Sequence, residues 1–324
     1  MTKRYFCTLF DSNYLLKGVA MLRSLARCCP QAHVYVLCMD ARTQRILTEL
    51  ELPHIECIAL PDLEDEALLA AKKERGVAEY CWTLSPCLPW YVLQNNLHVD
   101  FITYLDSDLL FYSSVENLFD EIGDASIAII EHRFSPRLQD REVNGRFCVE
   151  WVSFRRNDEG MACLSRWREQ CIEWCFYRLE EGRMGDQKYL DEWPGLYSSL
   201  HILQHPGAGI APWNYSQYHF AVDVNGQITV DGAPLIFYHF HQFQLLDDGS
   251  FDRLSVFYTA ECKEPADVYE AYESQLNIAL NDVRVVEPDF SGGLRPLAQI
   301  AGRRWLQRFV PFWIKDVVRR FIRY

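Results

Sequence analysis

The sequence predicts an α/β fold in which helices flank a mostly parallel central sheet. Three segments, 4–10, 33–39 and 55–60, are rich in the β-branched and aromatic residues that favour strands. Apolar residues at helical spacing follow the first two strands, at 14–29 and 41–51. An alternating order of strands and helices requires crossover connections between parallel strands, so helices should cover both faces of the sheet.

Turn-forming residues mark the ends of these elements. The first strand stops at Asp11-Ser12-Asn13, and Pro30 ends the first helix because proline lacks a backbone N–H. An acidic helix is expected from Asp62, and another helix closes over Tyr91–Asn95. The next strand, FITYL at 101–105, is almost wholly apolar, as expected at the centre of a parallel sheet.

The rest of the chain continues the alternation before it changes character. Extended structure is expected at 109–112 and a long helix at 158–181. Further strands are predicted at 126–131, 147–155, 200–204 and 234–240. After about residue 250 the pattern turns helical, and Ser291-Gly292-Gly293 has the composition of a linker.

The composition is that of an ordinary folded protein, with 49% hydrophobic and 24% charged residues. A formal charge of −13 argues against general binding of nucleic acid. The 12 cysteines show no CxxC spacing and accompany no secretory signal, which favours free thiols in the cytoplasm over a zinc site or disulfides. No window of about 20 apolar residues occurs, so no membrane-spanning helix is expected.

An acidic triplet, Asp106-Ser107-Asp108, follows directly on the buried strand 101–105. Ligands gather outside the carboxyl ends of strands in open parallel sheets. Two carboxylates at such an edge are costly to bury without a cation, and their hard oxygens favour Mg²⁺ or Mn²⁺. Such a metal can bridge the phosphates of a diphosphate leaving group. The alternative is a solvated turn, which an isolated Asp-x-Asp usually is.

Four motifs in order carry a resemblance to a known family. They are Thr8-Leu9-Phe10-Asp11 with Tyr14, then YLDSD, then Gly185-Asp186-Gln187, then Tyr238-His239-Phe240. In this order they resemble the GT-A glycosyltransferases, above all the glycogenin-like group, glycosyltransferase family 8. The GDQKYLDEWP and APWN segments are also similar to bacterial glycosyltransferases of surface-polysaccharide loci. The resemblance covers roughly residues 4–243.

This resemblance implies a GT-A (Rossmann-like) catalytic domain over residues 1–250. Its nucleotide-sugar half would span about 1–112 and its acceptor half about 113–250. Residues 251–324 would form a helical C-terminal extension.

The resemblance also implies the ligands of the donor. Asp11 and Tyr14 would cradle the nucleobase, although Asp11 can equally well cap the following helix. Asp106 and Ser107 would contact the nucleotide-sugar. The metal, Mn²⁺ or alternatively Mg²⁺, would be held by a ligand set consisting of Asp106, Asp108 and His239. His241 is a rival ligand because it lies on the same side of an extended strand.

Two residues match the family pair beside the transferred sugar, Asp186 and Gln187. The Asp186 carboxylate would hold sugar hydroxyls and the Gln187 carbonyl would lie near the anomeric carbon. The alternative for Asp186 is an N-cap of the following helix. Glu150 departs from the family pattern, since it stands in an apolar strand near the usual Gly, two residues after Cys148 in place of an Asn. A buried Glu needs a partner or a role, so we predict that Glu150 stabilises the developing cation, acts on the acceptor or pairs with an Arg.

A second departure concerns the diphosphate. The family's late Lys-Pro-Trp is replaced by Gln242-Phe243-Gln244, so the cation must come from elsewhere, with Arg155, Arg156 and Lys188 as candidates. The segment 205–214 has glycines that permit close approach to a ligand.

The segment 303–324 interleaves aromatic and basic residues, with seven Lys or Arg against one acid. This composition is typical of a helix in the membrane interface, attracted to anionic headgroups, and predicts peripheral attachment to the inner face of the cell membrane. Docking on the acidic body is the alternative.

The predicted reaction is transfer of a hexosyl unit from a UDP-sugar to a glycan or lipid-linked acceptor. The resemblance implies metal dependence and retention at the anomeric carbon. One alternative is a pyrophosphorylase or hydrolase, although 10–13 offers no Gly-rich basic loop. The other is a non-catalytic binder, which would not need to keep the acids and the histidine together.

Overall fold

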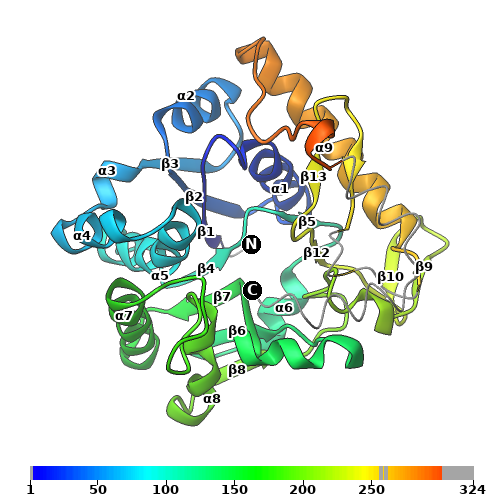
Figure 1. Ribbon diagram of the computed structural model, residues 1–324. Helices are drawn as coiled ribbons and strands as arrows, with labels where there is room; N and C mark the ends of the chain where they lie inside the picture. Colours follow the sequence, from blue (N-terminus) through cyan, green and yellow to red (C-terminus); the bar gives the residue numbers. More distant parts are fainter. Residues whose placement is uncertain (1–2, 255–257, 259–261, 301–324) are drawn as a thin grey trace.

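A seven-stranded sheet forms the centre of the computed structural model, which describes residues 3–254, 258 and 262–300 (Figure 1). The strand order is β3-β2-β1-β4-β7-β6-β8. The strands are β1 (Arg4–Phe10), β2 (Ala32–Cys38), β3 (Ile55–Ala59), β4 (Phe101–Leu105), β6 (Ile127–Glu131), β7 (Phe147–Arg155) and β8 (Leu200–Leu203). Only β7 in this sheet runs against the others, because it pairs antiparallel with both β4 and β6. The predicted α/β class with a mostly parallel sheet is confirmed.

Helices cover both faces of this sheet, and each face has its own hydrophobic core. One core contains residues of α1 (Leu15–Cys28), α2 (Ala41–Leu50), α6 (Glu116–Ile122) and α9 (Ala266–Val286). The other contains residues of α3 (Leu60–Leu63), α4 (Glu66–Glu74), α5 (Val77–Asn95) and α7 (Asp158–Glu173). Side chains alternate along the strands, so Phe6 enters the first core and Cys7 the second.

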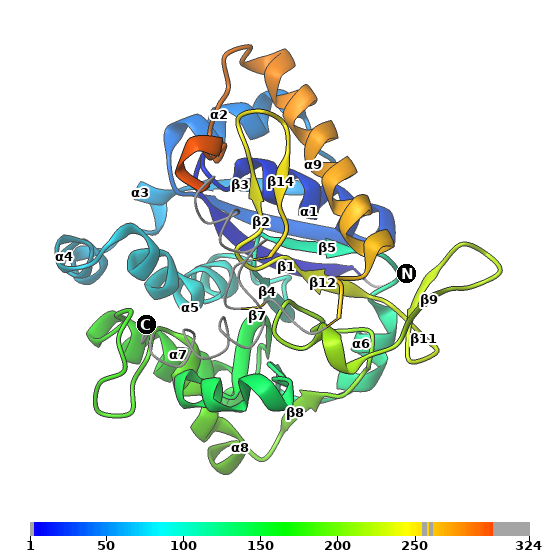
Figure 2. The same ribbon diagram turned by 45° about the vertical axis from the view of Figure 1, so that its right-hand side comes forward.

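Short elements complete the edge of the sheet. A two-stranded ribbon pairs β5 (Leu109–Phe111) with β12 (Phe237–His239) in antiparallel register. The sheet of β9 (Phe220–Val222), β10 (Ile228–Val230) and β11 (Ala233–Pro234) projects beside it, as Figure 2 shows. The remaining elements are β13 (Gln244–Leu245), β14 (Phe251–Asp252), α8 (Trp193–Leu196) and 3₁₀ helices at Pro136–Asn144, Gln187–Glu192 and Tyr215–Gln217.

Three predicted elements differ from the structure. The helix expected at 158–181 ends at Glu173, because Trp174 is extended and the following loop places Gly182 and Gly185 at positive φ. The acidic helix expected from Asp62 is divided into α3 and α4, where Asp65 caps α4 by accepting from the Leu68 N–H. The strand expected at 234–240 is broken into β11 and β12.

The C-terminal helix α9 packs back onto the N-terminal half and lies beside α1 (Figure 2). Arg23 of α1 pairs with Asp282 at 2.5 Å, and Glu287 just beyond α9 pairs with Arg42 and Arg45. A division of the chain at residue 250 stays a prediction. The basic segment 303–324 lies outside the described residues. Within the described part, no helix combines the length and the apolar character needed to cross a membrane.

The aromatic contact between Tyr272 of α9 and Phe240 connects this helix to the β12 ribbon. The two rings stack with centroids 3.7 Å apart, and Tyr272 is fully buried. Its hydroxyl has no hydrogen-bond partner among the described residues. The ring therefore contributes packing, whereas the hydroxyl contributes no bond.

We predict that Tyr272→Ala lowers the free energy of unfolding by about 3–5 kcal/mol, because it leaves a cavity between α9 and β12. Tyr272→Phe should change it by less than about 1 kcal/mol, since no hydrogen bond is lost. Urea-induced unfolding of both variants measures the difference. A small loss in Tyr272→Ala would show that α9 is not part of the cooperative fold.

Candidate active site

A cavity of about 1060 Å³ opens at the carboxyl ends of β1 and β4. It brings together most of the residues that the sequence singled out. Those lining it are Asp11, Tyr14, Asp106, Ser107, Asp108, Asp186, Gln187 and His239. The rival ligand His241 also lines it, whereas Glu150 does not.

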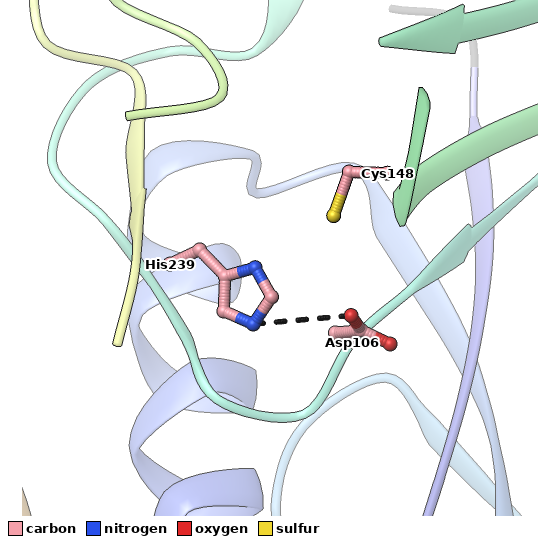
Figure 3. A group of neighbouring side chains, drawn as sticks. All are labelled: Asp106, Cys148 and His239. Carbon is pink, nitrogen blue, oxygen red and sulfur yellow. Dashed lines mark ion pairs between the residues drawn. The ribbon is translucent and has the colours of Figure 1, made fainter. Parts of the chain in front are cut away.

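The acidic triplet and His239 form one cluster within this cavity. The His239 Nε2 lies 3.0 Å from the Asp108 Oδ1 and 3.9 Å from the Asp106 Oδ2. Figure 3 shows Asp106 and the thiol of Cys148 on the same side of the His239 ring. Two sets of possible ligand atoms, each within 4.8 Å of one another, share His239: one adds Asp106 and Cys148, the other Asp108 and His241.

Backbone pairing holds this cluster in place. The triplet leaves the end of β4, and the Asp106 N–H donates to the Glu150 carbonyl of β7 at 3.4 Å. The chain then enters β5, whose Leu109 lies opposite His239 of β12. The Phe240 N–H donates to the Asp108 carbonyl at 2.9 Å. Residues more than 100 positions apart are therefore joined by main-chain hydrogen bonds rather than by side chains alone.

The charges of the cluster influence one another strongly. Burial raises the pKa of Asp106 to about 7, although His239 acts in the opposite direction. Burial would also raise the pKa of Asp108, but the nearby His239 and Lys17 hold it well below its usual range. Burial disfavours the charged form of His239, yet Asp108 outweighs it and raises the pKa of the imidazole well above its usual value. Burial lowers the pKa of His241 to about 4, so this ring favours the neutral form that a metal requires.

Glu150 lies beneath His239. Its side chain is fully buried, and its Oε2 accepts a hydrogen bond from the His239 Nδ1 at 2.7 Å. A carboxylate can only accept, so this contact places a proton on Nδ1. The raised pKa of the ring also keeps a proton on Nε2, which donates to Asp108, and a bound metal would have to displace that proton. Glu150 does not line the cavity. Its Oε1 has no hydrogen-bond partner among the described residues, so the predicted pairing with an Arg is not found there.

The donor set fits a divalent cation. The Asp106 and Asp108 carboxylates both lie near the imidazole, although they belong to separate sets of converging atoms that share His239. The imidazole is backed by a carboxylate on its second nitrogen, as metal-bound histidines usually are. An imidazole beside carboxylates suits Mn²⁺ better than Mg²⁺. Asp106, Asp108 and His239 would hold the ion.

Asp186 and Gln187 line the same cavity, and Asp186 lies close enough to Asp106 to raise the pKa of that carboxyl. Burial raises the pKa of Asp186 to about 7, with Ser85 of α5 acting in the opposite direction. Asp186 occupies the N-cap position of a 3₁₀ helix, but its side chain makes no capping hydrogen bond there. The Gln187 Nε2 donates to the Asn144 carbonyl at 3.0 Å, and Gln187 lines the cavity.

The other end of the cavity is built from the loop after β1. Asp11 Oδ1 accepts from the backbone N–H groups of Asn13 and Tyr14, at 2.9 and 3.1 Å, so it does organise the turn into α1 while lining the cavity. The segment after α9 returns to this loop. A Cβ on Gly293, whose φ is +74°, would meet the Asn13 carbonyl at 2.1 Å. The predicted linker 291–293 is thus packed against the cavity rather than free of it.

The candidate cations for a diphosphate are corrected by the structure. Arg155 and Arg156 lie at the opposite edge of the sheet, since Arg155 pairs with Phe101, and both bond to main-chain carbonyls there. Lys188 is paired with Asp191 at 2.7 Å. The basic side chain beside the cluster is Lys17, whose Nζ lies 3.6 Å from the Asp108 Oδ2.

Sequence reasoning missed several lining residues. Lys17 could have been found, because it lies one helical turn after Tyr14 and shares its face. Trp82 and Tyr177, which contact each other at the rim with ring centroids 5.4 Å apart, come from α5 and from the loop that was expected to be helical. No local pattern in the sequence places these two segments together.

Comparisons with known proteins place the chain in a family. No protein-family model matches it. It is 30% identical over 311 residues to the uncharacterized protein YfnD of Bacillus subtilis (strain 168), a match that covers 95% of this chain and 99% of YfnD. It is 31% identical over 299 residues to the uncharacterized protein YfnF of the same organism, covering 90% of this chain and 97% of YfnF. The chain belongs to the YfnD and YfnF family.

A solved structure identifies the fold of this YfnD-like chain. The glycosyltransferase GlyE of Streptococcus pneumoniae TIGR4 superposes with a TM-score of 0.50 at 14% identity, covering 91% of this chain and 66% of GlyE. Its apo form gives a TM-score of 0.51 at 16% identity, covering 87% of this chain and 63% of GlyE. The chain therefore spans slightly less than two thirds of GlyE, and the likeness confirms the predicted GT-A fold.

We predict that Glu150→Gln weakens the binding of Mn²⁺ by about 10–100-fold, because the neutral amide no longer orients His239 or raises its basicity. Titration calorimetry with Mn²⁺ on the full chain measures this. Glu131→Gln is the matched control, since Glu131 loses the same charge on neighbouring β6 but pairs with Arg146. Equal Mn²⁺ affinities in the two variants, with a loss of stability in Glu150→Gln alone, would assign Glu150 a structural role only.

Proposed function

We propose that this protein is a metal-dependent glycosyltransferase of the glycogenin-like type that transfers a hexosyl unit from a UDP-sugar. The observation that carries the proposal is the cluster of Asp106, Asp108 and His239 in the same cavity as Asp186 and Gln187. Metal ligands at one position and a sugar-binding pair at another are the two requirements of a nucleotide-sugar site. The shared fold with GlyE, a glycosyltransferase, is consistent with this function.

Each end of the cavity has its own part in binding the donor. The Tyr14 ring, 45% exposed, offers a stacking surface for uracil, and Asp11 with Ser107 lines the approach to it. The bound Mn²⁺ or Mg²⁺ would neutralise the diphosphate and stabilise it as a leaving group. Asp186, which lines the cavity, would accept hydrogen bonds from sugar hydroxyls.

The reaction that we propose proceeds with retention at the anomeric carbon. The Gln187 side chain is held by the hydrogen bond that its Nε2 donates to the Asn144 carbonyl, and its own carbonyl would face the carbon at which positive charge develops. Glu150 acts through His239 rather than on the sugar, because it is fully buried and hydrogen-bonded to that ring. It is thus a positioning residue in this proposal.

The acceptor would enter over the apolar rim of the cavity. Val77 is 73% exposed and Tyr177 46% exposed, and both line the cavity near Trp82. Exposed rings and apolar surface at a cavity mouth suit the face of a sugar ring. We propose a glycan or a lipid-linked sugar as the acceptor, which agrees with peripheral attachment of the protein through 303–324 to an anionic membrane surface.

The proposal predicts that the purified chain releases UDP from one member of a UDP-sugar panel in the presence of Mn²⁺. EDTA should abolish turnover and added Mn²⁺ restore it. Asp108→Asn should lower kcat/KM by at least about 100-fold, because a metal ligand is lost. Asp282→Asn is the control, since Asp282 lies on α9 and pairs with Arg23 outside the cavity.

The same assay separates the alternatives. NMR of the product would show an α-linkage to the acceptor if the anomeric centre is retained. Water as the only acceptor would indicate a hydrolase, and donor binding without turnover would indicate a binding protein. Absence of any Mn²⁺-dependent use of UDP-sugars would contradict the proposal.

For the C-terminal segment, the expected result is that the full chain sediments with vesicles containing anionic lipid and that a chain ending at residue 302 does not. Binding should weaken with rising salt, because it depends on the basic residues. Neutral vesicles are the control. If both forms stay in the supernatant, membrane attachment through this segment is excluded.

A further inference from the structure

One lysine lies between the two ends of the donor cavity. Lys17 is on α1, one turn beyond Tyr14, and its Nζ is 4.6 Å from the centroid of the Tyr14 ring. The same nitrogen is 3.6 Å from the Asp108 Oδ2. The side chain is only 14% exposed, and it lines the cavity. Its ammonium group thus lies between the Tyr14 ring and the Asp108 carboxylate, a candidate metal ligand.

We infer that Lys17 supplies the second cation that binds the diphosphate of the donor. This inference rests on the proposed function. In a UDP-sugar the diphosphate joins the nucleoside to the sugar, so it must lie between Tyr14 and Asp186 and next to Asp108. The Lys17 side chain extends from α1 into the space between Tyr14 and Asp108. A lysine ammonium is a compact charge that suits phosphate oxygens.

The other basic side chains that line the cavity are less well placed. Arg295 is exposed and belongs to the segment packed on Asn13, at the nucleobase end. Arg141 belongs to the 3₁₀ helix whose last residue, Asn144, contacts Gln187, at the sugar end. Among the described residues, Lys17 is the one that lies beside the carboxylates of the cluster.

A diphosphate gives Lys17 a role that its contact with Asp108 alone does not explain. Asp108 is already bonded to His239 at 3.0 Å and would bind the metal, so it does not need a second cation for its own charge. A bound metal and the ammonium would instead face the phosphate oxygens together. Fixed positive charges at the leaving diphosphate stabilise the charge that develops as the bond to the sugar breaks. The charge expected in a late loop is therefore provided by α1.

The test compares the binding of uridine and UDP to the full chain in the presence of Mn²⁺, by titration calorimetry. Lys17→Met should weaken UDP binding by about 10–100-fold, because a charge-assisted contact is lost. Binding of uridine, which has no phosphate, should not change. Lys17→Arg keeps the charge and should retain most of the affinity for UDP. Arg23→Met, a loss of charge on the same helix but outside the cavity, should bind UDP as the wild type does.

A third measurement separates phosphate binding from an effect on the metal ligands. Without nucleotide, Lys17→Met should bind Mn²⁺ at least as tightly as the wild type, because a competing cation beside Asp108 has been removed. Weaker Mn²⁺ binding, equal losses for uridine and UDP, or an unchanged affinity for UDP would each overturn the inference. A phosphate-specific loss in Arg295→Met instead of Lys17→Met would assign the contact to Arg295. Failure of the wild type to bind UDP at all would overturn the proposed function as well.

Discussion

The site depends on one structural constraint, the pairing of β5 with β12 next to the end of β4. This pairing places the His239 imidazole over the acidic triplet and sets its contact with Asp108 at 3.0 Å. It also puts His239 against the reversed strand β7, from which Glu150 reaches its second ring nitrogen. Main-chain hydrogen bonds fix the backbone on both sides of the ring, so the cluster is organised before any ligand binds. Preorganisation of this kind reduces the free energy that a ligand must supply to order its site.

The C-terminal half of the chain contributes to this organisation from a distance. Helix α9 supports β12 through the stacked rings of Tyr272 and Phe240, directly after His239. Beyond α9 the chain returns to the loop after β1, where Gly293 leaves no room for a side chain against Asn13. Residues after 265 therefore support both the His239 cluster and the nucleobase end of the cavity. This explains how a segment with the composition of a linker can be fixed in place, since its glycines allow close backbone contact.

The sequence predicted the structure correctly where a local pattern of residues determines a local element. The strand 101–105 and the triplet behind it could be placed because apolar runs and sheet edges have simple rules. The loop after Glu173 could not be predicted, because apolar residues continue at helical spacing beyond Trp174, where the backbone is extended. The partner of Glu150 was hidden for another reason. The sequence indicates that a glutamate in an apolar strand needs a partner. The partner, His239, is seen only in the structure, because the β5–β12 pairing joins residues 130 positions apart.

The departures from the glycogenin-like pattern that the sequence resembles become consistent when they are considered together. Cys148 and Glu150 replace smaller or neutral residues under the cluster, and Glu150 adds negative charge directly behind His239. That added charge raises the basicity of the imidazole and makes the cluster more negatively charged. Loss of the late Lys-Pro-Trp would increase the imbalance further. A lysine on α1 brings positive charge next to Asp108, and under the proposed function this charge would reduce the repulsion between the carboxylates and the diphosphate of the donor. The positions of Glu150 and Lys17 are thus two parts of one electrostatic arrangement, with the imidazole and Asp108 between them.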